Sequence, residues 1–123
     1  MKILLDGDEH IRLEPGPPPL TIEADRADRS YSSFQMLASA LATCSWSVLA
    51  SWAEQAELDT TGLAIDVRWE FVDDPHRVGR MQVELDWPGL PEARKEAARR
   101  VMSLCAVHQT LHHSPQIDLT VRR

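Results

Sequence analysis

Apolar residues alternate with other residues along the first 24 positions of the chain. Three pairs, each separated by one residue, occur at Ile3 and Leu5, Ile11 and Leu13, and Leu20 and Ile22. A period of two is typical of strands with one buried face. Asp6-Gly7-Asp8 is a turn sequence, and Pro15-Gly16-Pro17-Pro18-Pro19 is a stiff connection with few N–H donors. The pattern predicts short strands within 1–24.

The same period of two returns over a longer stretch, between positions 62 and 87. One run of apolar positions consists of Leu63, Ile65, Val67, Trp69 and Phe71, and the other of Met81, Val83, Leu85 and Trp87. Polar and charged residues fill most positions between them, and Asp73-Asp74-Pro75-His76 is a turn sequence that separates the runs. We predict an antiparallel hairpin over 62–87 with one dry face and one wet face.

Between these two stretches the period changes to that of a helix. Apolar residues recur at helical spacing at Phe34, Leu37, Leu41, Cys44, Val48 and Trp52. Ser32 or Ser33 is placed to cap the helix, and no charge follows before Glu54. A helix that is apolar or small nearly all round should be buried on most sides, which a chain this short cannot achieve alone. We predict a central helix over about 32–56 that packs partly against a partner subunit.

A second helix over about 91–112 and a last strand over 116–122 complete the predicted elements. Pro88-Gly89 ends the hairpin, Ser114-Pro115 ends the helix, and Ile117, Leu119 and Val121 alternate with polar residues beyond it. The predicted fold is α+β. It is a single domain, 1–123, in which an antiparallel sheet packs on a long buried central helix plus a second helix.

The chain is acidic, which limits its partners. Its 123 residues hold 13 Lys and Arg against 19 Asp and Glu, a formal charge of -6. An acidic protein repels phosphate groups, so we expect no nucleic acid and no membrane as partners. The N-terminus lacks the pattern of a signal peptide, and the uncharged stretch 30–53 holds many serines, too many for a membrane span. We therefore expect a cytoplasmic protein.

Cys44 and Cys105 are the two cysteines of the chain. A cytoplasmic protein is not expected to hold a structural disulfide, so they are either inert core residues or redox-active thiols. A thiolate needs a positive charge, a helix N-terminus or a hydrogen bond, and none is close to Cys44 in the sequence. His108 lies three residues after Cys105, where it is placed to interact with that thiol. Spacing alone leaves both interpretations open.

Cys105, His108 and His112 also have the spacing of metal ligands along one helix face. Three ligands within one helix seldom close a tetrahedral site, so a fourth ligand would be needed from Cys44 or a carboxylate. Metal binding therefore stays as the less favoured alternative, and we expect no metal ion at this site.

The contexts of the two cysteines resemble the two motifs of the OsmC/Ohr family. Residues 33–44, Ser-Phe-Gln-Met-Leu-Ala-Ser-Ala-Leu-Ala-Thr-Cys, look like the family's buried-helix motif, in which a Pro-Phe-Glu-Leu-Leu-type entry leads to a cysteine. Residues 105–111, Cys-Ala-Val-His-Gln-Thr-Leu, look like its second motif, usually Cys-Pro-Val-His-Arg-Thr-Leu. The resemblance covers the chain from about Leu20 to Val121 and includes the order of the predicted elements.

This resemblance implies an OsmC-like interlocked homodimer and a thiol-dependent peroxidase that acts on organic hydroperoxides. Cys44 would attack the peroxide bond and become a sulfenic acid. Cys105 would then form a disulfide with it, which an external dithiol would reduce. The resemblance implies neither a metal nor an organic cofactor.

The chain departs from the family at the residues that steady the thiolate. Active members use an Arg from an N-terminal turn, held by the Glu of the helix-entry motif. This chain has the acidic turn Asp6-Gly7-Asp8-Glu9 instead, and Gln35 stands at the helix entry. Arg12 is the nearest substitute, and Arg26 and Arg29 are alternatives.

Two consequences are expected from these departures. An acidic turn near Cys44 would raise the pKa of its thiol. Ala106 stands where the second motif has proline, so we expect the second helix to run on through it. The missing Arg and Glu favour a second hypothesis, an OsmC-like homodimer that binds an apolar small molecule with little or no peroxidase activity.

Overall fold

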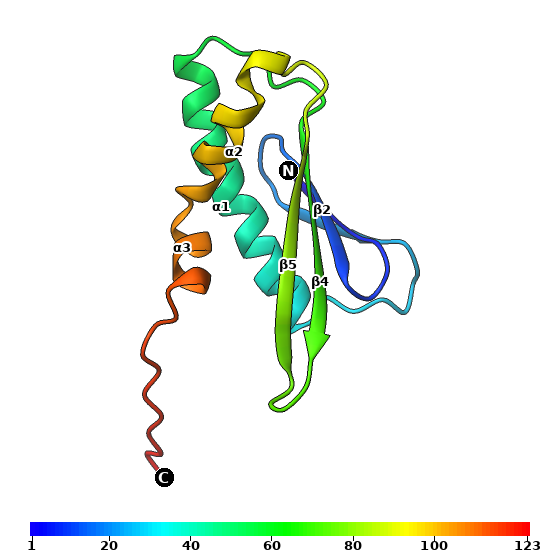
Figure 1. Cartoon of the computed structure of the whole chain (residues 1–123). Coiled ribbons are helices and arrows are strands. Elements are labelled where there is room, and N and C mark those ends of the chain that lie inside the picture. Colours follow the sequence, from blue (N-terminus) through cyan, green and yellow to red (C-terminus); the bar gives the residue numbers. More distant parts are fainter.

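The computed structural model describes residues 1–123 and shows one sheet crossed by a long helix (Figure 1). Its strands are β1 (Lys2–Leu5), β2 (His10–Glu14), β3 (Thr21–Ala24), β4 (Ala64–Val72) and β5 (Arg77–Asp86). Its helices are α1 (Ser33–Gln55), the short 3-10 helix η1 (Glu92–Arg94), α2 (Lys95–Ser103) and α3 (Ala106–His112). The N-terminal strands, the central helix and the hairpin lie within the ranges that the hydrophobic periods predict.

The sheet has five strands in the order β3-β1-β2-β4-β5. Its strands pair antiparallel except at one edge, where β3 runs parallel to β1 with Ile22 opposite Ile3. The prediction of an antiparallel sheet is therefore wrong at this edge, and the sheet is mixed. The proline-rich segment 15–19 is too stiff for a tight hairpin turn, so it carries the chain back past β1 instead.

α1 lies across the inner face of the sheet, which buries one side of the helix. Ala38, Ala42 and Leu49 are fully buried there, against strands β2 and β4. Small residues allow the helix backbone to approach the sheet closely, so larger ones such as Trp52 lie at the flanks, half-buried. Met36 is 49% exposed on the opposite side. One chain therefore covers α1 on one side only, as expected for a chain too short to surround this helix, and the predicted packing against a partner subunit stays a prediction.

By length and composition alone, α1 is long and apolar enough to cross a membrane, with 23 residues and a mean hydropathy of 1.3 in its most apolar window. The serines of 30–53 therefore do not exclude a span, contrary to the sequence argument. Core helices of soluble proteins meet the same criterion, and the buried side of α1 packs on β2 and β4. We assign α1 to the core on this packing.

The second helix is not continuous over 91–112, which corrects the sequence prediction. It breaks after α2, and Cys105 takes an extended conformation with ψ of 129° before α3 begins. The side chain of Cys105 accepts the N–H of His108 and so caps α3. This capping bond forms only when Cys105 lies outside the helix in an extended conformation. The helix therefore breaks here, even though Ala106 itself would tolerate a helix.

Residues 116–122 form no strand in the structure, which also corrects the sequence prediction. Beyond α3 the chain extends away from the body of the molecule (Figure 1). Ile117, Leu119 and Val121 are 76%, 91% and 90% exposed. The alternating pattern is present, but a strand needs a neighbour for its backbone hydrogen bonds, and this segment has none within its own chain.

Candidate active site

The fold brings Cys44 and Cys105 together, although 60 residues separate them in the chain. Cys44 lies in the middle of α1, half-buried, and Cys105 lies fully buried at the break between α2 and α3. Both are free thiols, and a hydrogen bond joins their side chains. The two residues with the strongest sequence case for chemistry therefore form one site.

The pKa of Cys44 is lowered from its ordinary value. Burial acts in the opposite direction and is the largest single influence, because it disfavours the thiolate. Three hydrogen bonds together outweigh it: one from the thiol of Cys105, and two from the backbone N–H groups of Val107 and Ala106 at the start of α3. No carboxylate acts on Cys44, so the prediction that the acidic turn raises its pKa is wrong.

The pKa of Cys105 is raised, so the two thiols differ in acidity. Burial is the main cause, and the hydrogen bond to Cys44 adds to it, because Cys105 donates its proton there. The N–H of His108 acts in the opposite direction and does not cancel these effects. Cys44 is therefore the more acidic of the two thiols.

Arg12 lies on the other face of the sheet and does not contact Cys44. Its neighbours in β2, Ile11 and Leu13, are fully buried on the inner face, so Arg12 points outward. Its guanidinium donates to Asp66 at 2.6 Å and to Asp86 at 2.8 Å. Both contacts hold the charged guanidinium on the outer face, so the expected role of Arg12 in stabilising the thiolate is wrong for this arrangement of the chain.

Gln35 lies in the first turn of α1 and connects the helix to the acidic turn before β2. Its amide N–H donates to the carbonyl oxygen of Asp8 at 2.9 Å, and its amide oxygen accepts the hydroxyl of Ser32. The side chain is buried and lies nine residues, more than two helical turns, before Cys44. Gln35 therefore anchors the helix entry and does not touch the thiol.

The two alternative arginines are also held elsewhere. Arg29 donates to Asp25 at 3.0 and 3.1 Å and also contacts Asp8, and these bonds lower the pKa of Asp25 to about 2. Arg26 pairs with Asp28 at 2.7 Å. Neither guanidinium acts on Cys44. The groups that lower the pKa of Cys44 are a thiol and two backbone N–H groups, and no arginine is among them.

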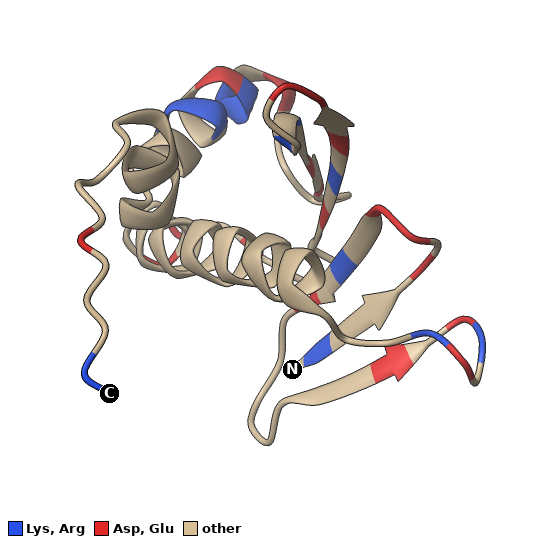
Figure 2. Ribbon diagram, turned by 90° about the horizontal axis from the view of Figure 1, so that it is seen from below, with Lys and Arg blue, Asp and Glu red and all other residues tan.

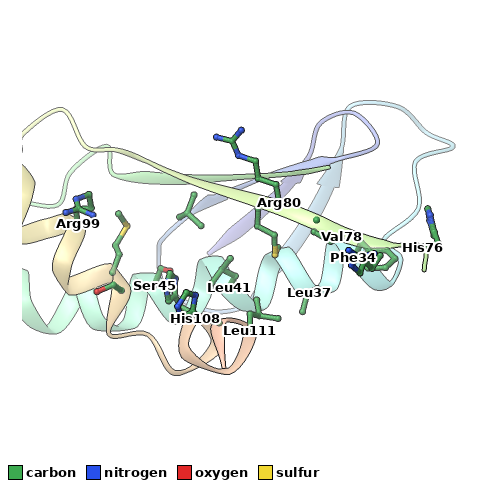
Figure 3. Close-up of a pocket in the computed structure, with 17 residues that line it drawn as sticks. Phe34, Leu37, Leu41, Ser45, His76, Val78, Arg80, Arg99, His108 and Leu111 are labelled. Carbon is green, nitrogen blue, oxygen red and sulfur yellow. The ribbon is translucent and has the colours of Figure 1, made fainter. Parts of the chain in front are cut away.

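A cleft of about 790 Å³ lies next to the cysteine pair, between β5 on one side and α1, α2 and α3 on the other (Figure 3). Eight of its 17 lining residues are hydrophobic. Leu41 and Ser45 of α1 and His108 of α3 line it, and these residues flank Cys44 and Cys105 in the chain. Neither cysteine is among the lining residues, and His108 faces the cleft beside Ser45.

The residues of the metal alternative do not form a ligand set. The break at Cys105 takes its side chain off the face that carries His108 and His112, whose rings stack with centroids 6.1 Å apart. No group of three or more His, Cys, Asp or Glu side chains is arranged to hold a metal ion. His108 contributes its backbone N–H to Cys105 and its ring to the cleft.

The start of α3 is the functional element that the sequence did not reveal. As at any helix start, its first N–H groups have no partner within the helix. Here these groups act on the two thiols instead. The usual capping residues are Ser, Thr, Asp and Asn, and Cys105 is none of these. The second motif itself held a signal. The family usually has proline where this chain has Ala106, and proline is typical of the first position of a helix.

Comparisons with known proteins identify a family for this chain. The family model for OsmC-like proteins matches residues 26–120. A search of curated proteins finds no match.

Two crystal structures share the fold. One is described as an osmotic stress induced and detoxification response protein from Psychrobacter arcticus 273-4, with a TM-score of 0.63 and 22% identity over 71% of this chain. The other is an OsmC-like hydroperoxide resistance protein from Jannaschia sp. CCS1, with a TM-score of 0.59 and 17% identity over 80% of this chain.

At such identities these structures establish the fold alone. The matches cover 64% of the Psychrobacter chain and 71% of the Jannaschia chain, so this chain matches only part of the length of each. The family model, in contrast, includes both cysteines and the three helices that position them. By this match over most of its length, the chain belongs to the OsmC-like protein family.

Proposed function

We propose that this chain is a thiol-dependent peroxidase that reduces organic hydroperoxides through Cys44 and Cys105. The observation that carries the proposal is the hydrogen bond between the two thiols, with the pKa of Cys44 lowered and that of Cys105 raised. A two-cysteine peroxidase needs this division between a nucleophilic thiolate and a second, protonated thiol. The adjacent cleft supports an organic substrate, because it offers apolar space beside the thiols.

In the first step, the Cys44 thiolate attacks the outer oxygen of the hydroperoxide. A sulfur–oxygen bond forms, the O–O bond breaks, and the alkoxide leaves as an alcohol once it takes a proton. We assign this proton to Cys105, because its thiol shares a hydrogen bond with Cys44 and is the less acidic of the two. Cys44 is then a sulfenic acid, and Cys105 is left as a thiolate.

In the second step, Cys105 attacks the sulfur of the Cys44 sulfenic acid. The disulfide forms and the hydroxyl group leaves as water after it takes a proton. An external dithiol then supplies two electrons through thiol–disulfide exchange and restores both thiols. We include a dithiol reductant and a cytoplasmic location in this proposal. The cytoplasm is a reducing compartment, so it would return the disulfide to two thiols.

Cumene hydroperoxide provides the test. One equivalent should consume both free thiols and give a Cys44–Cys105 disulfide by mass spectrometry. Cys44→Ser should leave Cys105 unreacted, whereas Cys105→Ser should react once and stop at a sulfenic acid that dimedone traps. Survival of both thiols in the unaltered chain would refute the peroxidase.

A second candidate function is the binding of an apolar small molecule with little or no peroxidase activity. The position of the cleft supports it, because Phe34, Leu37 and Leu41 line the cleft while neither cysteine does. Gln35 also lacks the carboxylate that active family members have at this position. Native mass spectrometry of freshly purified protein should then show a bound lipid or aromatic compound. An empty protein that turns over hydroperoxide would contradict this function.

A further inference from the structure

The second step of the proposed reaction needs a proton that neither cysteine supplies. Cys105 attacks the sulfenic acid as a thiolate, because its own proton has gone to the alkoxide of the first step. The hydroxyl group that leaves Cys44 must take a proton to depart as water, and a positioned acid makes such a transfer fast. The cleft beside the thiols is the place to look for that acid.

Every charged or titratable side chain that lines the cleft is basic, and none of its 17 lining residues is Asp or Glu. These side chains are Arg77 and Arg80 of β5, Arg99 of α2, His76 just before β5, and His108 and His112 of α3. A guanidinium does not lose its proton in a protein, so the arginines cannot donate one. An imidazole gains and loses a proton near neutral pH, so the donor is among the three histidines.

His108 is the histidine that the fold places beside the cysteines. Its backbone N–H donates to the sulfur of Cys105 at 3.3 Å, in the cap at the start of α3. Helical side chains lean toward the N-terminus of their helix, so the half-buried ring of His108 leans toward the end of α3 that carries Cys105. Figure 3 shows this ring beside Ser45, the residue that follows Cys44 in α1.

The other two histidines of the cleft lie farther from the cysteines. Figure 3 shows His76 at the opposite end of the cleft from His108, and its ring stacks on Phe71 and lies 3.1 Å from Asp73. His112 is one helical turn beyond His108, and the two rings stack with centroids 6.1 Å apart. His108 is therefore the donor nearest to the reacting sulfurs.

The surroundings of His108 leave its ring free to change its protonation state. Its ring forms no ion pair, and α1 contributes only uncharged residues to the cleft. Arg99 of α2 is paired with Glu96, and Figure 3 shows Arg80 pointing away from the cleft. Arg77 donates to two backbone carbonyl oxygens in the turn before β5. The imidazolium can therefore release its proton without breaking an ion pair.

We propose that His108 is the proton donor of the second step, an inference that rests on the proposed peroxidase function. The Cys105 thiolate attacks the Cys44 sulfur, the sulfur–oxygen bond breaks, and the hydroxyl group takes the imidazolium proton and leaves as water. His108 is then neutral. Oxidation of the external dithiol releases two protons, of which one returns to Cys105 and the other to His108.

His108→Gln tests the proposal, with His113→Gln as the matched control. Glutamine keeps the backbone N–H that donates to Cys105, but its side chain releases no proton. His113 is exposed at the end of the same helix, outside the lining of the cleft. One equivalent of cumene hydroperoxide should oxidise Cys44 at the same rate in both variants and in the unaltered chain.

The variants should differ in the step that follows. At pH 7 the disulfide should form about 100-fold more slowly in His108→Gln, so that dimedone traps a sulfenic acid on Cys44. His113→Gln should form the disulfide as fast as the unaltered chain does. Rapid-quench mass spectrometry measures both species.

Two further measurements separate a proton donor from a residue that only shapes the site. In the unaltered chain, disulfide formation should slow as the pH rises and the imidazolium loses its proton, and His108→Gln should lose this dependence. Added imidazole should restore rapid disulfide formation in His108→Ala, because the shortened side chain opens space on the cleft. It should not speed up the unaltered chain.

Each contrary result has a distinct meaning. Equal rates of disulfide formation in His108→Gln and the unaltered chain would overturn the role of His108 and leave the peroxidase standing. A slower rate that keeps its pH dependence and does not respond to imidazole would also overturn it, because it would indicate a displaced Cys105. Survival of both thiols in the unaltered chain would overturn the peroxidase and this proposal together.

Discussion

The two faces of the sheet stabilise polar groups by different means. On the outer face, the carboxylate of Asp66 accepts from Arg12 at 2.6 Å and lies 2.7 Å from the ring nitrogen of His10. On the inner side, the Cys44 sulfur has only a thiol and two backbone N–H groups as partners. Figure 2 shows the same division, since charged residues lie on the strands, loops and α2 while α1 is nearly free of them.

The ion pairs of the outer face therefore stabilise the fold, whereas a different set of groups acts on the Cys44 thiol. The cations that could have stabilised a thiolate are already paired with carboxylates on the outer face or in the N-terminal loops. The thiolate relies on neutral donors that the fold presents at a helix start, which carry no net charge into the apolar layer. Changes on the outer face should therefore alter stability alone, and changes at α3 should alter the thiol.

Arg12→Ala should have the largest effect on stability and none on the thiols. It leaves the Asp66 carboxylate, whose side chain is 10% exposed, with the ring nitrogen of His10 as its remaining side-chain partner. We expect a loss of about 2–3 kcal/mol in the free energy of unfolding, below the cost for a fully buried pair because Arg12 is partly exposed. Urea unfolding measures this loss.

Arg80→Ala is the control for that change, because Arg80 lies on the same outer face without an ion-pair partner. It should change stability by less than about 0.5 kcal/mol. If Arg12→Ala instead raised the pKa of Cys44, measured by thiol alkylation against pH, the separation of the two faces would be wrong.

Gln35→Glu should have the second-largest effect, although it restores the carboxylate that the family carries. A carboxylate cannot donate to the carbonyl oxygen of Asp8, so the bond at 2.9 Å would become a repulsion at a buried position. We expect a loss of about 2 kcal/mol at pH 7. Burial would raise the pKa of the new carboxyl, so the loss should diminish at low pH, where it is protonated.

Gln35→Ala is the control, because it removes the same bond without adding a charge. Its loss of stability should not change with pH between 4 and 7. An unchanged stability in Gln35→Glu, with faster peroxide reduction, would show that this position acts on the thiol and not only on the helix entry.

Elements with a regular spacing of apolar residues were predictable from the sequence. Elements whose structure depends on a neighbour far away in the chain were not. α1 and the hairpin follow local patterns of apolar residues, so their ranges came directly from spacing. The parallel pairing of β3 depends on where a stiff loop carries the chain. The segment 116–122 has a correct strand pattern and lacks only its neighbour, which a local pattern cannot supply.

The cysteines were predictable as the candidate site, but the groups that act on Cys44 were not. Cys44 and Cys105 were identified by motif resemblance, and the fold places them together. The donors to Cys44 are backbone N–H groups of residues 106 and 107, and every residue type except proline has such a group. A sequence search for an activating side chain therefore leads to Arg12, which is charged but on the wrong face.

Ala106→Pro tests the activation directly and should have a smaller effect. It removes one N–H donor to Cys44, and the extended conformation of Cys105 and the first position of α3 both suit a following proline. We expect the pKa of Cys44 to rise, so the rate of peroxide reduction at pH 7 should fall by up to about tenfold. The rate should recover at higher pH, where the thiolate forms again.

Val107→Ala is the control, because it keeps every backbone donor, and its pH profile should be unchanged. A rate that falls equally at all pH values in Ala106→Pro would indicate a displaced residue rather than a lost donor.

Arg29→Ala should have the smallest effect of the four changes. Arg29 connects Asp25 to the acidic turn, and its hydrogen bonds are the main reason why the pKa of Asp25 falls to about 2. A lowered carboxyl pKa stabilises the fold above the ordinary pKa of aspartate, and this contribution disappears as the pH falls through the lowered value. The variant should therefore melt about 1–3 °C lower than the unaltered chain at pH 7, with the difference closing near pH 2.

Arg26→Ala, whose pair with Asp28 is exposed on both sides, is the control and should melt as the unaltered chain does at pH 7. If Arg29→Ala also slowed peroxide reduction, the N-terminal loop would act on the thiol after all, because no contact of Arg29 in this chain leads to Cys44.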